Sequence, residues 1–297
     1  MPGRNRLRLG MLKKRRKGVV IRMEKYKIVT LPDDEPYRYW KLFDDTYVIH
    51  YGEALDIFLL LGEQKALLID TAYGRGELPN LVEQLREGKE LLVVNTHGHY
   101  DHTGGNPWFP RVHMHPNAMA TADRAFGRID PTWLANMPYP DYEKIPVDDG
   151  YVFDLGGREV EVLWTPAHCN SSLSFIDHKR RLLFSGDEFD AGQANLGAFE
   201  SVGAFLKNCQ RLKSREADFD FIMPNHNGCP IANVYLDDFI TAALHVVDGR
   251  PDLVSFDGLP GYKQSHGGGV RVQVGNSCIN YRPQGVEPTP FKMVEEK

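Results

Sequence analysis

The sequence lacks a long apolar segment and is poor in cysteine. Its longest apolar runs, "IFLLLG" and "ALLI", are much shorter than the roughly 20 residues that a membrane-spanning helix requires. The four cysteines, Cys169, Cys209, Cys229 and Cys278, are far apart and show no paired spacing. This pattern favours a reducing, cytoplasmic compartment over a disulfide framework, and it predicts no membrane span.

Acidic residues are absent from the first 22 residues, which contain nine Lys or Arg. Since the whole chain has a net charge of −5, this segment of +9 leaves −14 on residues 23–297. The segment has no apolar core of the kind that a secretory signal needs. We expect residues 1–22 to be a disordered extension, or the product of a start upstream of Met23, with nucleic-acid or membrane contact as the alternative. The acidic body disfavours nucleic acid as a partner.

The whole chain has the composition of an ordinary globular protein, with 42% hydrophobic and 25% charged residues. "REVEVLW" alternates valine with glutamate, which predicts a half-buried strand. Helical spacing of apolar residues appears near 78–85, 202–212 and 236–244, and Cys209 is a small apolar member of the second stripe. The third helix is expected to stop at Gly249, ahead of Pro251.

These patterns predict an α/β protein with a single domain over residues 23–297. Further short strands are expected in "YVIH", "IFLLL", "ALLID", "LLVVN", "RLLFSGD" and "FDFIMP". Residues 103–150 are rich in proline and aromatic side chains and are expected to form an insertion between strands, with a helix near 116–126.

Histidine is concentrated in one stretch, "NTHGHYDHTGGN" at residues 95–106, directly after the predicted strand "LLVVN". His97 and His99 are two apart, so an extended loop places both on one side. Asp101 and His102 can then lie around the turn and face a second position. Imidazole and carboxylate together suit zinc or another borderline divalent ion. The alternative is an exposed polar turn that happens to be rich in histidine.

The chain resembles the metallo-beta-lactamase-fold hydrolases, with a subfamily that is not identified. Five segments are similar to the signatures of that family and occur in its order between residues 45 and 230: "LLIDTAYG", "THGHYDH", "TPAHCNSS", "FSGDEF" and "MPNHNG". The resemblance implies an α/β fold of four layers, an αββα sandwich with mixed sheets and outer helices.

The resemblance also implies a metal site and a mechanism. Two divalent ions are expected, zinc first and iron or manganese as alternatives, with a bridging hydroxide as the nucleophile. Asp101 is expected to act in catalysis as well, by passing the proton of the hydroxide to the leaving group. The implied assignment is one metal on His97, His99 and His168, a second on Asp101, His102 and His226, Asp187 as the bridge, and Asp70 as a support behind the ligands.

The remaining histidines match no signature, and we expect surface or core roles for His50, His113, His115, His178, His245 and His266. Aromatic residues of the 103–150 segment have two interpretations. They cover the edges of the core, or Trp108, Trp133 and Tyr139 line an apolar substrate pocket beside the metals.

At several positions this chain differs from known branches of the family that it resembles, and each difference disfavours the activity of that branch. Asp187 stands where the true beta-lactamases have no aspartate, and the residues after it lack the tyrosine of the quorum-quenching lactonases. No equivalent of the glutathione-binding domain of the glyoxalase II thioesterases follows His226. His99 stands where the flavodiiron reductases have glutamate.

A hydrolase that cleaves a small ester, lactone, thioester or amide is therefore the leading expectation. The first alternative is a persulfide dioxygenase with one iron bound by two histidines and one aspartate; a phosphodiesterase on the same fold is another. A binding module with an idle site is disfavoured by the intact ligand set. The expected partner is a small-molecule substrate, and a homo-oligomer stays open.

Overall fold

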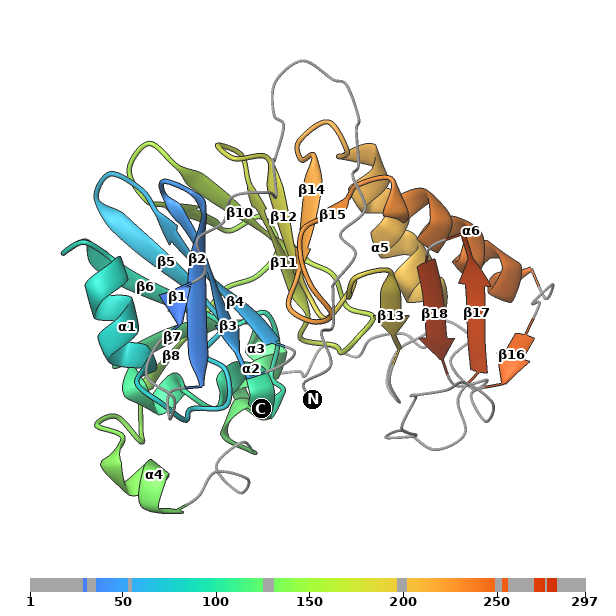
Figure 1. Ribbon diagram of the computed structural model, residues 1–297. Coiled ribbons are helices and arrows are strands. Elements are labelled where there is room, and N and C mark those ends of the chain that lie inside the picture. The colour runs from blue at the N-terminus through green and yellow to red at the C-terminus, as the bar shows by residue number, and fades with distance from the viewer. Residues whose placement is uncertain are drawn as a thin grey trace, which may run out of the picture.

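The computed structural model describes residues 29–30, 36–52, 55–124, 131–196, 202–248, 253–255, 270–275 and 277–281. Two sheets pack face to face, and helices cover their outer faces (Figure 1). This confirms the αββα sandwich that the family resemblance implied. The basic segment 1–22 and its expected disorder lie outside the described residues.

The first sheet has eight strands in sequence order. Strands β1 to β5 pair antiparallel, and β5 to β8 pair parallel. Its members are β1 (Val29–Thr30), β2 (Tyr37–Phe43), β3 (Thr46–Tyr51), β4 (Leu55–Leu61), β5 (Lys65–Ile69), β6 (Glu90–Val94), β7 (Arg111–Met114) and β8 (Glu143–Pro146).

The second sheet has six strands in the order β15-β14-β12-β11-β10-β9. Strands β12 and β14 pair parallel, and the other neighbours pair antiparallel. Its members are β9 (Val152–Asp154), β10 (Glu159–Trp164), β11 (Leu173–Asp177), β12 (Leu182–Gly186), β14 (Phe221–Pro224) and β15 (Ile231–Ala232). In β10, Val160 and Val162 are buried whereas Glu159 is exposed, which confirms the predicted alternation.

The main core lies between the two sheets. Phe58 of β4 contacts Phe184 of β12 at 4.9 Å between ring centroids, and Val48, Leu60, Leu67 and further apolar residues of both sheets join this layer. Every residue of β4 is buried, because one face of this strand meets the second sheet and the other meets helix α1. A strand buried on both faces reads as a continuous apolar run, as "IFLLL" does.

The predicted helices cover the outer faces. Helix α1 (Leu78–Leu85) packs on the first sheet, while α5 (Val202–Ser214) and α6 (Tyr235–Val247) pack on the second. Cys209 is buried in the stripe of α5, as predicted. The expected stripe of α6 is wrong at one end, since Leu244 is 38% exposed and Ala242 and Val246 are buried instead. This helix is apolar around most of its surface, so spacing alone did not select the buried face.

A third, small sheet lies beside α6 and was not predicted. It contains β13 (Gln193–Asn195), β18 (Ser277–Tyr281), β17 (Val270–Val274) and β16 (Leu253–Ser255) in that order. Strand β13 pairs parallel with β18, which comes from the other end of the chain. One face of this sheet, with Val272, Ile279 and Tyr281, joins the core around α5 and α6.

The segment 103–150 contains both sheet strands and helices. Strands β7 and β8 continue the first sheet, and short helices lie around them: α2 (Tyr100–Thr103), a 3-10 helix η2 (Asn106–Trp108), α3 (Pro116–Met119) and α4 (Pro131–Asn136). Of the helix expected near 116–126, the described residues show α3 over four residues and a 3-10 turn at 122–124, while residues 125 and 126 lie outside the described ranges. No helix in the described ranges is long and apolar enough to span a membrane.

Candidate metal centre

Loops at one end of the two sheets bring the candidate ligands together. Asp70 follows β5, and the ligand loop 95–103 follows the parallel neighbour β6. Asp187 follows β12, and His226 lies two residues after the parallel neighbour β14. Because parallel strands end at the same edge of a sheet, these side chains converge from segments far apart in the sequence.

His97, His99 and His168 form the first ligand group. The Nδ1 atom of His99 lies 2.9 Å from Nε2 of His97 and 3.0 Å from Nε2 of His168. The three ring nitrogens lie within 4.8 Å of one another. This is the set that the resemblance implied for one metal.

Asp101, His102 and His226 form the second ligand group. The Oδ2 atom of Asp101 is 3.7 Å from Nε2 of His102 and 3.5 Å from Nε2 of His226. Helix α2 begins at Tyr100, so Asp101 and His102 lie on its first turn; the ring of His102 still contacts that of His97 at 4.1 Å between centroids, so the two groups adjoin.

Asp187 lies between the two groups. One carboxylate oxygen, Oδ1, is 3.3 Å from Nε2 of His102. The other, Oδ2, is 3.5 Å from Nε2 of His226 and 3.7 Å from Nε2 of His168. A single carboxylate thus faces members of both groups.

Asp70 is fully buried behind the ligands and accepts four hydrogen bonds. Its Oδ1 accepts from the Thr96 backbone N–H at 2.7 Å. Its Oδ2 accepts from the Thr96 hydroxyl, from Nδ1 of His102 and from the Asn225 side-chain amide, each at 2.8 Å. A carboxylate can only accept here, so His102 carries its proton on Nδ1 and directs the lone pair of Nε2 to the site.

Two further ligands are oriented in the same way. Nδ1 of His168 donates to the backbone carbonyl of Asn195 at 2.9 Å, which leaves its Nε2 lone pair facing His99. The Thr96 hydroxyl donates to Asp70 and accepts from Nδ1 of His97 at 3.0 Å. Fixed tautomers of this kind are typical of metal-binding histidines.

The donor set fits divalent metal ions. In the described part of the chain, Nε2 of His102 and Oδ1 of Asp187 are buried, lie 3.3 Å apart and have no hydrogen-bond partner. Buried polar atoms without partners are costly, and a cation would satisfy both. Imidazole nitrogens and carboxylate oxygens are ligands that zinc and similar ions accept.

The charges of the site differ between the two groups. Burial lowers the pKa of His99 to about 4, and burial also lowers the pKa of His97, so both rings are neutral and able to bind a metal. Burial opposes a charge on His102 too, but Asp187, Asp101 and Asp70 outweigh it and raise its pKa. The second group therefore lies in a negative field that attracts cations.

Two buried acids beside the ligands were missed by the sequence analysis. Glu188 accepts the backbone N–H of His168 at 3.0 Å and the side-chain amide of Asn208 at 2.8 Å. Asp190 accepts from the side-chain amide of Asn195 at 3.1 Å. Both follow Asp187 in "GDEFD", but nothing in that stretch indicates which acid faces the candidate ligands and which supports a loop.

The three predicted pocket residues have different outcomes. Trp108 is partly buried, donates from Nε1 to the Gly74 carbonyl at 3.0 Å, and packs with Tyr100 around Met137. Tyr139 is 43% exposed. The side chain of Trp133 lies outside the described part of the structure.

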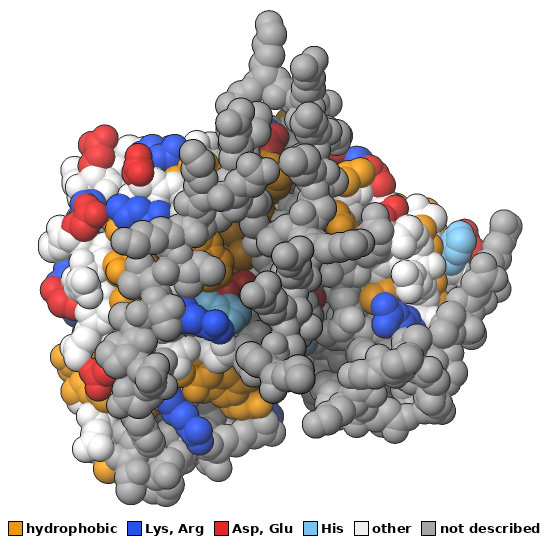
Figure 2. Space-filling view, viewed as in Figure 1, with side chains coloured by type: hydrophobic (Ala, Val, Ile, Leu, Met, Phe, Trp, Pro, Cys, Tyr) orange, Lys and Arg blue, Asp and Glu red, His pale blue; other side chains and the backbone are white. Residues whose placement is uncertain are grey.

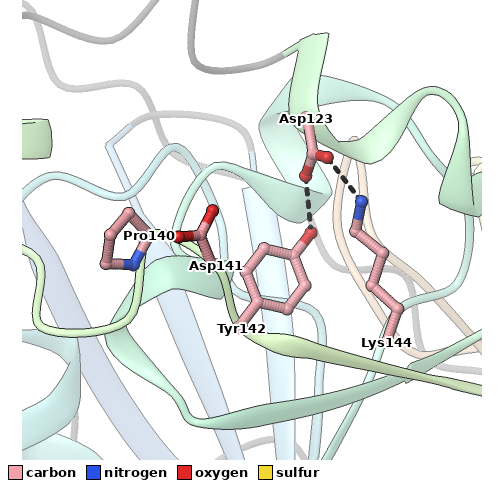
Figure 3. Close-up of a pocket in the computed structure, with 5 residues that line it drawn as sticks. All are labelled: Asp123, Pro140, Asp141, Tyr142 and Lys144. Carbon is pink, nitrogen blue, oxygen red and sulfur yellow. Dashed lines mark hydrogen bonds and ion pairs between the residues drawn. The ribbon is translucent and has the colours of Figure 1, made fainter.

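A pocket of about 300 Å³ lies away from the ligands. Figure 3 shows its lining, in which Asp123 bonds both the Tyr142 hydroxyl and the Lys144 ammonium group. The Tyr142 hydroxyl also accepts from the Asn106 amide at 3.2 Å, so this wall is held by an internal network. None of the candidate metal ligands lines this pocket.

The other histidines make structural contacts. His50 bonds Asp56 at 2.7 Å, His113 bonds the Val93 carbonyl at 2.9 Å, and His178 bonds Glu161 at 3.0 Å. His115 is buried and stacks on Trp164, and His245 lies in the last turn of α6. These placements agree with the predicted surface or core roles; His266 is outside the described residues.

Comparisons with known proteins point to one family. A sequence model of the metallo-beta-lactamase superfamily matches residues 51–258. The human acyl-coenzyme A thioesterase MBLAC2 is 30% identical over 189 residues, which are 54% of this chain and 68% of that protein. The atrochrysone carboxyl ACP thioesterase nsrC of Aspergillus novofumigatus is 25% identical over 192 residues, which are 63% of this chain and 51% of that protein.

Solved structures show the same fold. The metallo-beta-lactamase family protein TTHA1429 from Thermus thermophilus aligns with a TM-score of 0.54 at 24% identity, over 70% of this chain and 82% of that one. The DIM-1 metallo-beta-lactamase aligns with a TM-score of 0.55 at 19% identity, over 71% of this chain and 98% of that one.

Proposed function

Because the chain belongs to the metallo-beta-lactamase superfamily, in which its curated relatives include enzymes named as thioesterases, we propose that this hydrolase cleaves a thioester at a dinuclear metal site. The proposed ligands are His97, His99 and His168 for one ion and Asp101, His102 and His226 for the other. Asp187 is the proposed bridge, and zinc is the proposed metal.

The position of Asp187 supports the dinuclear site most directly. Its two oxygens face nitrogens of both ligand groups at 3.3 to 3.7 Å, and one of them is buried without a hydrogen-bond partner. If only one cation were bound, Asp187 would bind it through one oxygen, and its other oxygen would face the imidazole of the other ligand group without a cation between them. A shared carboxylate places negative charge between two cations and reduces their mutual repulsion.

Divalent ions held by these residues would acidify an attacking water and polarise the carbonyl of the substrate. The side chains of the protein supply orientation and proton transfer. Asp101 is ionised, because His102 and His226 outweigh the effect of its burial and lower its pKa. The carboxylate of Asp101 can therefore accept the proton of the attacking water and return it to the leaving group.

A thioester suits this set of groups. A thiol has an ordinary pKa of about 8.5, so a thiolate leaves with much less protonation than an alkoxide requires. Among the described residues around the site, Asp101 is the only ligand that we assign to proton transfer, and one weak acid is enough for such a leaving group.

Metal analysis combined with a substrate panel tests the proposal. Purified protein should contain two equivalents of metal and should hydrolyse thioesters with a higher kcat/KM than matched lactones, oxygen esters or phosphodiesters. A single iron and oxygen-dependent consumption of persulfide would instead indicate the dioxygenase alternative. A preference for phosphodiesters would contradict the thioester assignment while leaving the metal site intact.

Ligand variants test the assignment of each residue. His168→Ala and His226→Ala should each lose one equivalent, and the two should lose different ones. His178→Ala is the matched control, because its imidazole pairs with Glu161 on the surface. If both ligand variants keep two equivalents at saturation, the assignment is wrong.

A further inference from the structure

An aromatic surface adjoins the second ligand group. Tyr51 contacts Tyr73 at 5.1 Å between ring centroids, and Tyr73 contacts Tyr100 at 5.2 Å. Tyr100 directly precedes Asp101, and it packs with Trp108 around Met137. We call Tyr51, Tyr73 and Tyr100 the tyrosine face. In Figure 2, hydrophobic side chains gather on the first-sheet side of the molecule, in the region of α2.

The loop that carries Tyr73 is held tightly against the ligand loop. A Cβ on Gly74 would lie 2.3 Å from the Gly104 carbonyl oxygen, and a Cβ on Gly104 would lie 2.7 Å from the Tyr73 carbonyl. The ring of Tyr73 contacts that of Tyr100, which directly precedes Asp101, so this side chain lies close to the second ligand group. The tyrosine face is thus preorganised next to the metals.

Polar side chains of the third sheet lie next to the first ligand group; Asn280 is buried, and Gln193, Asn195 and Arg271 are partly buried. Side chains on one face of the third sheet come from residues that are directly paired across the strands: Gln193 with Cys278, Asn195 with Asn280, and Asn280 with Arg271. Directly opposed residues share a face, and the alternate residues of these strands join the apolar core. We call Gln193, Asn195, Asn280 and Arg271 the polar face.

Hydrogen bonds join the polar face to the metal site. The Asn280 amide donates to the Asn195 side chain at 2.7 Å, and the Asn195 amide donates to Asp190 at 3.1 Å. The backbone carbonyl of Asn195 accepts from His168 at 2.9 Å. Strands are spaced by about 4.8 Å, so Arg271 on β17 lies roughly 10 Å across the sheet from Asn195 on β13. In Figure 1, β13, β18 and β17 lie to the right of α2.

Arg271 carries the only cationic side chain of the polar face. Its Nε is buried without a hydrogen-bond partner, its guanidinium group lies against the Cys278 thiol on the same face, and no ion pair with a carboxylate is found for it within the described ranges. An arginine in this position is suited to a phosphate or another anion of a ligand, because its planar donors bind such groups in pairs.

We propose that the thioester lies across the two ligand groups in one direction, with its acyl group on the tyrosine face and its hydrophilic, phosphate-bearing carrier along the polar face, where Arg271 binds the anion. This inference rests on the proposed thioesterase function. It places the scissile carbonyl between the two ligand groups. It also assigns acyl selectivity to Tyr73 and carrier selectivity to Arg271.

Two substrate series separate these assignments. The first compares octanoyl with butanoyl thioesters of the same carrier. The second compares coenzyme A thioesters with N-acetylcysteamine thioesters, which have the same reacting bond but no phosphate. Tyr73→Leu should lower the octanoyl preference in kcat/KM by about fivefold and leave the carrier preference unchanged, because each buried methylene contributes to binding. Arg271→Gln should lower the coenzyme A preference by about tenfold and leave the acyl preference unchanged.

Control variants distinguish a specific change in substrate preference from a general loss of folding or activity. Tyr73→Phe keeps the ring and should keep the octanoyl preference, and Arg271→Lys keeps the charge and should keep part of the coenzyme A preference. Tyr151→Leu and Arg111→Gln change an exposed tyrosine and an exposed arginine on other strands or turns, and should change neither ratio. Tyr51→Leu repeats the acyl test at a second position if Tyr73→Leu does not fold.

Each result has a definite meaning. Wild-type protein that hydrolyses no thioester overturns the proposed function and this orientation with it. Wild-type protein that hydrolyses thioesters, combined with variants that slow all four substrates by the same factor, overturns the orientation alone. An Arg271→Gln variant that changes acyl preference, or a Tyr73→Leu variant that changes carrier preference, reverses the assignment of the two faces and also overturns it.

Discussion

Replacement of Asp70 by asparagine tests how the buried support behind the ligands controls the metals. In the wild type, Oδ2 of Asp70 accepts three hydrogen bonds and Oδ1 accepts one. An asparagine amide replaces one acceptor by a donor. With its NH2 group on the Oδ1 side, it faces the Thr96 backbone N–H; with its NH2 group on the Oδ2 side, it faces the donors of His102, Thr96 and Asn225.

The less damaging orientation places the NH2 group on the Oδ1 side. There the NH2 group and the Thr96 backbone N–H, both donors, still face each other in a buried position, and the negative charge of Asp70 is lost. Each hydrogen bond to a charged group contributes about 1.5–3 kcal/mol, so the free energy of unfolding should fall by about 2–4 kcal/mol. The Nδ1–H of His102 also loses its charged acceptor, which weakens the direction of Nε2 toward the site. Losses of this kind reduce metal affinity by about 10- to 100-fold.

Metal competition with a chromogenic chelator measures the affinity, and urea unfolding of the metal-free protein measures the stability. Asp177→Asn is the control, since Asp177 is fully buried and bonds Arg158, yet it lies at the opposite end of β11 from Leu173, which bonds the ligand loop. We expect Asp177→Asn to lose stability and keep its metals. Equal losses of metal affinity in both variants, or unchanged affinity in Asp70→Asn, would refute the supporting role.

Three further substitutions have definite expected outcomes. Asp187→Asn removes the charge shared by the two ligand groups, so activity should fall by orders of magnitude while circular dichroism stays normal; normal turnover with two metals bound would contradict the bridging role. Gly105→Ala places a Cβ 2.3 Å from the Thr71 carbonyl oxygen, so the two loops must separate and both metal content and melting temperature should fall. Burial raises the pKa of Asp45, but the hydrogen bonds and charge of Arg180 outweigh it and hold the pKa below its ordinary value of 3.8. The stabilisation is therefore fully present above that value and is lost as pH falls from it through the lower pKa of the folded protein, so Asp45→Asn should cost about 1 kcal/mol at pH 7 and less in urea unfolding at pH 3; an equal cost at both pH values would contradict the ion pair.

Local patterns predicted the elements whose environment is uniform along their length. The alternation of Glu159 and Val160 predicted β10, because one face of that strand is buried and the other meets solvent. The apolar spacing from Leu78 to Leu85 predicted α1 for the same reason. The pattern failed for Leu244 of α6, because that helix is apolar on several sides and only its neighbours decide which side is buried.

The candidate ligands fall into two classes in the same way. His97, His99, Asp101 and His102 lie in one loop, so their spacing alone indicated a metal site. Asp70, His168, Asp187 and His226 are isolated in the sequence, and only the resemblance to a family proposed them as part of the site. The structure brings all eight to one end of the two sheets.

The sequence by itself determined the α/β class, several strands and helices, the ligand loop and the chemical nature of its donors, because these depend on short-range periodicity and on residue type; the sandwich was implied by the family resemblance. The tertiary structure alone decided the surroundings of the site. The parallel pairing of β13 with β18 joins residues that are far apart in the chain, and it places Asn195 against His168 and Arg271 on the same face as Asn280. Packing of the Gly74 loop on Gly104 likewise brings Tyr73 into contact with Tyr100, the residue before Asp101. These contacts join residues that are far apart in the sequence. No local pattern of apolar and polar residues therefore indicates them.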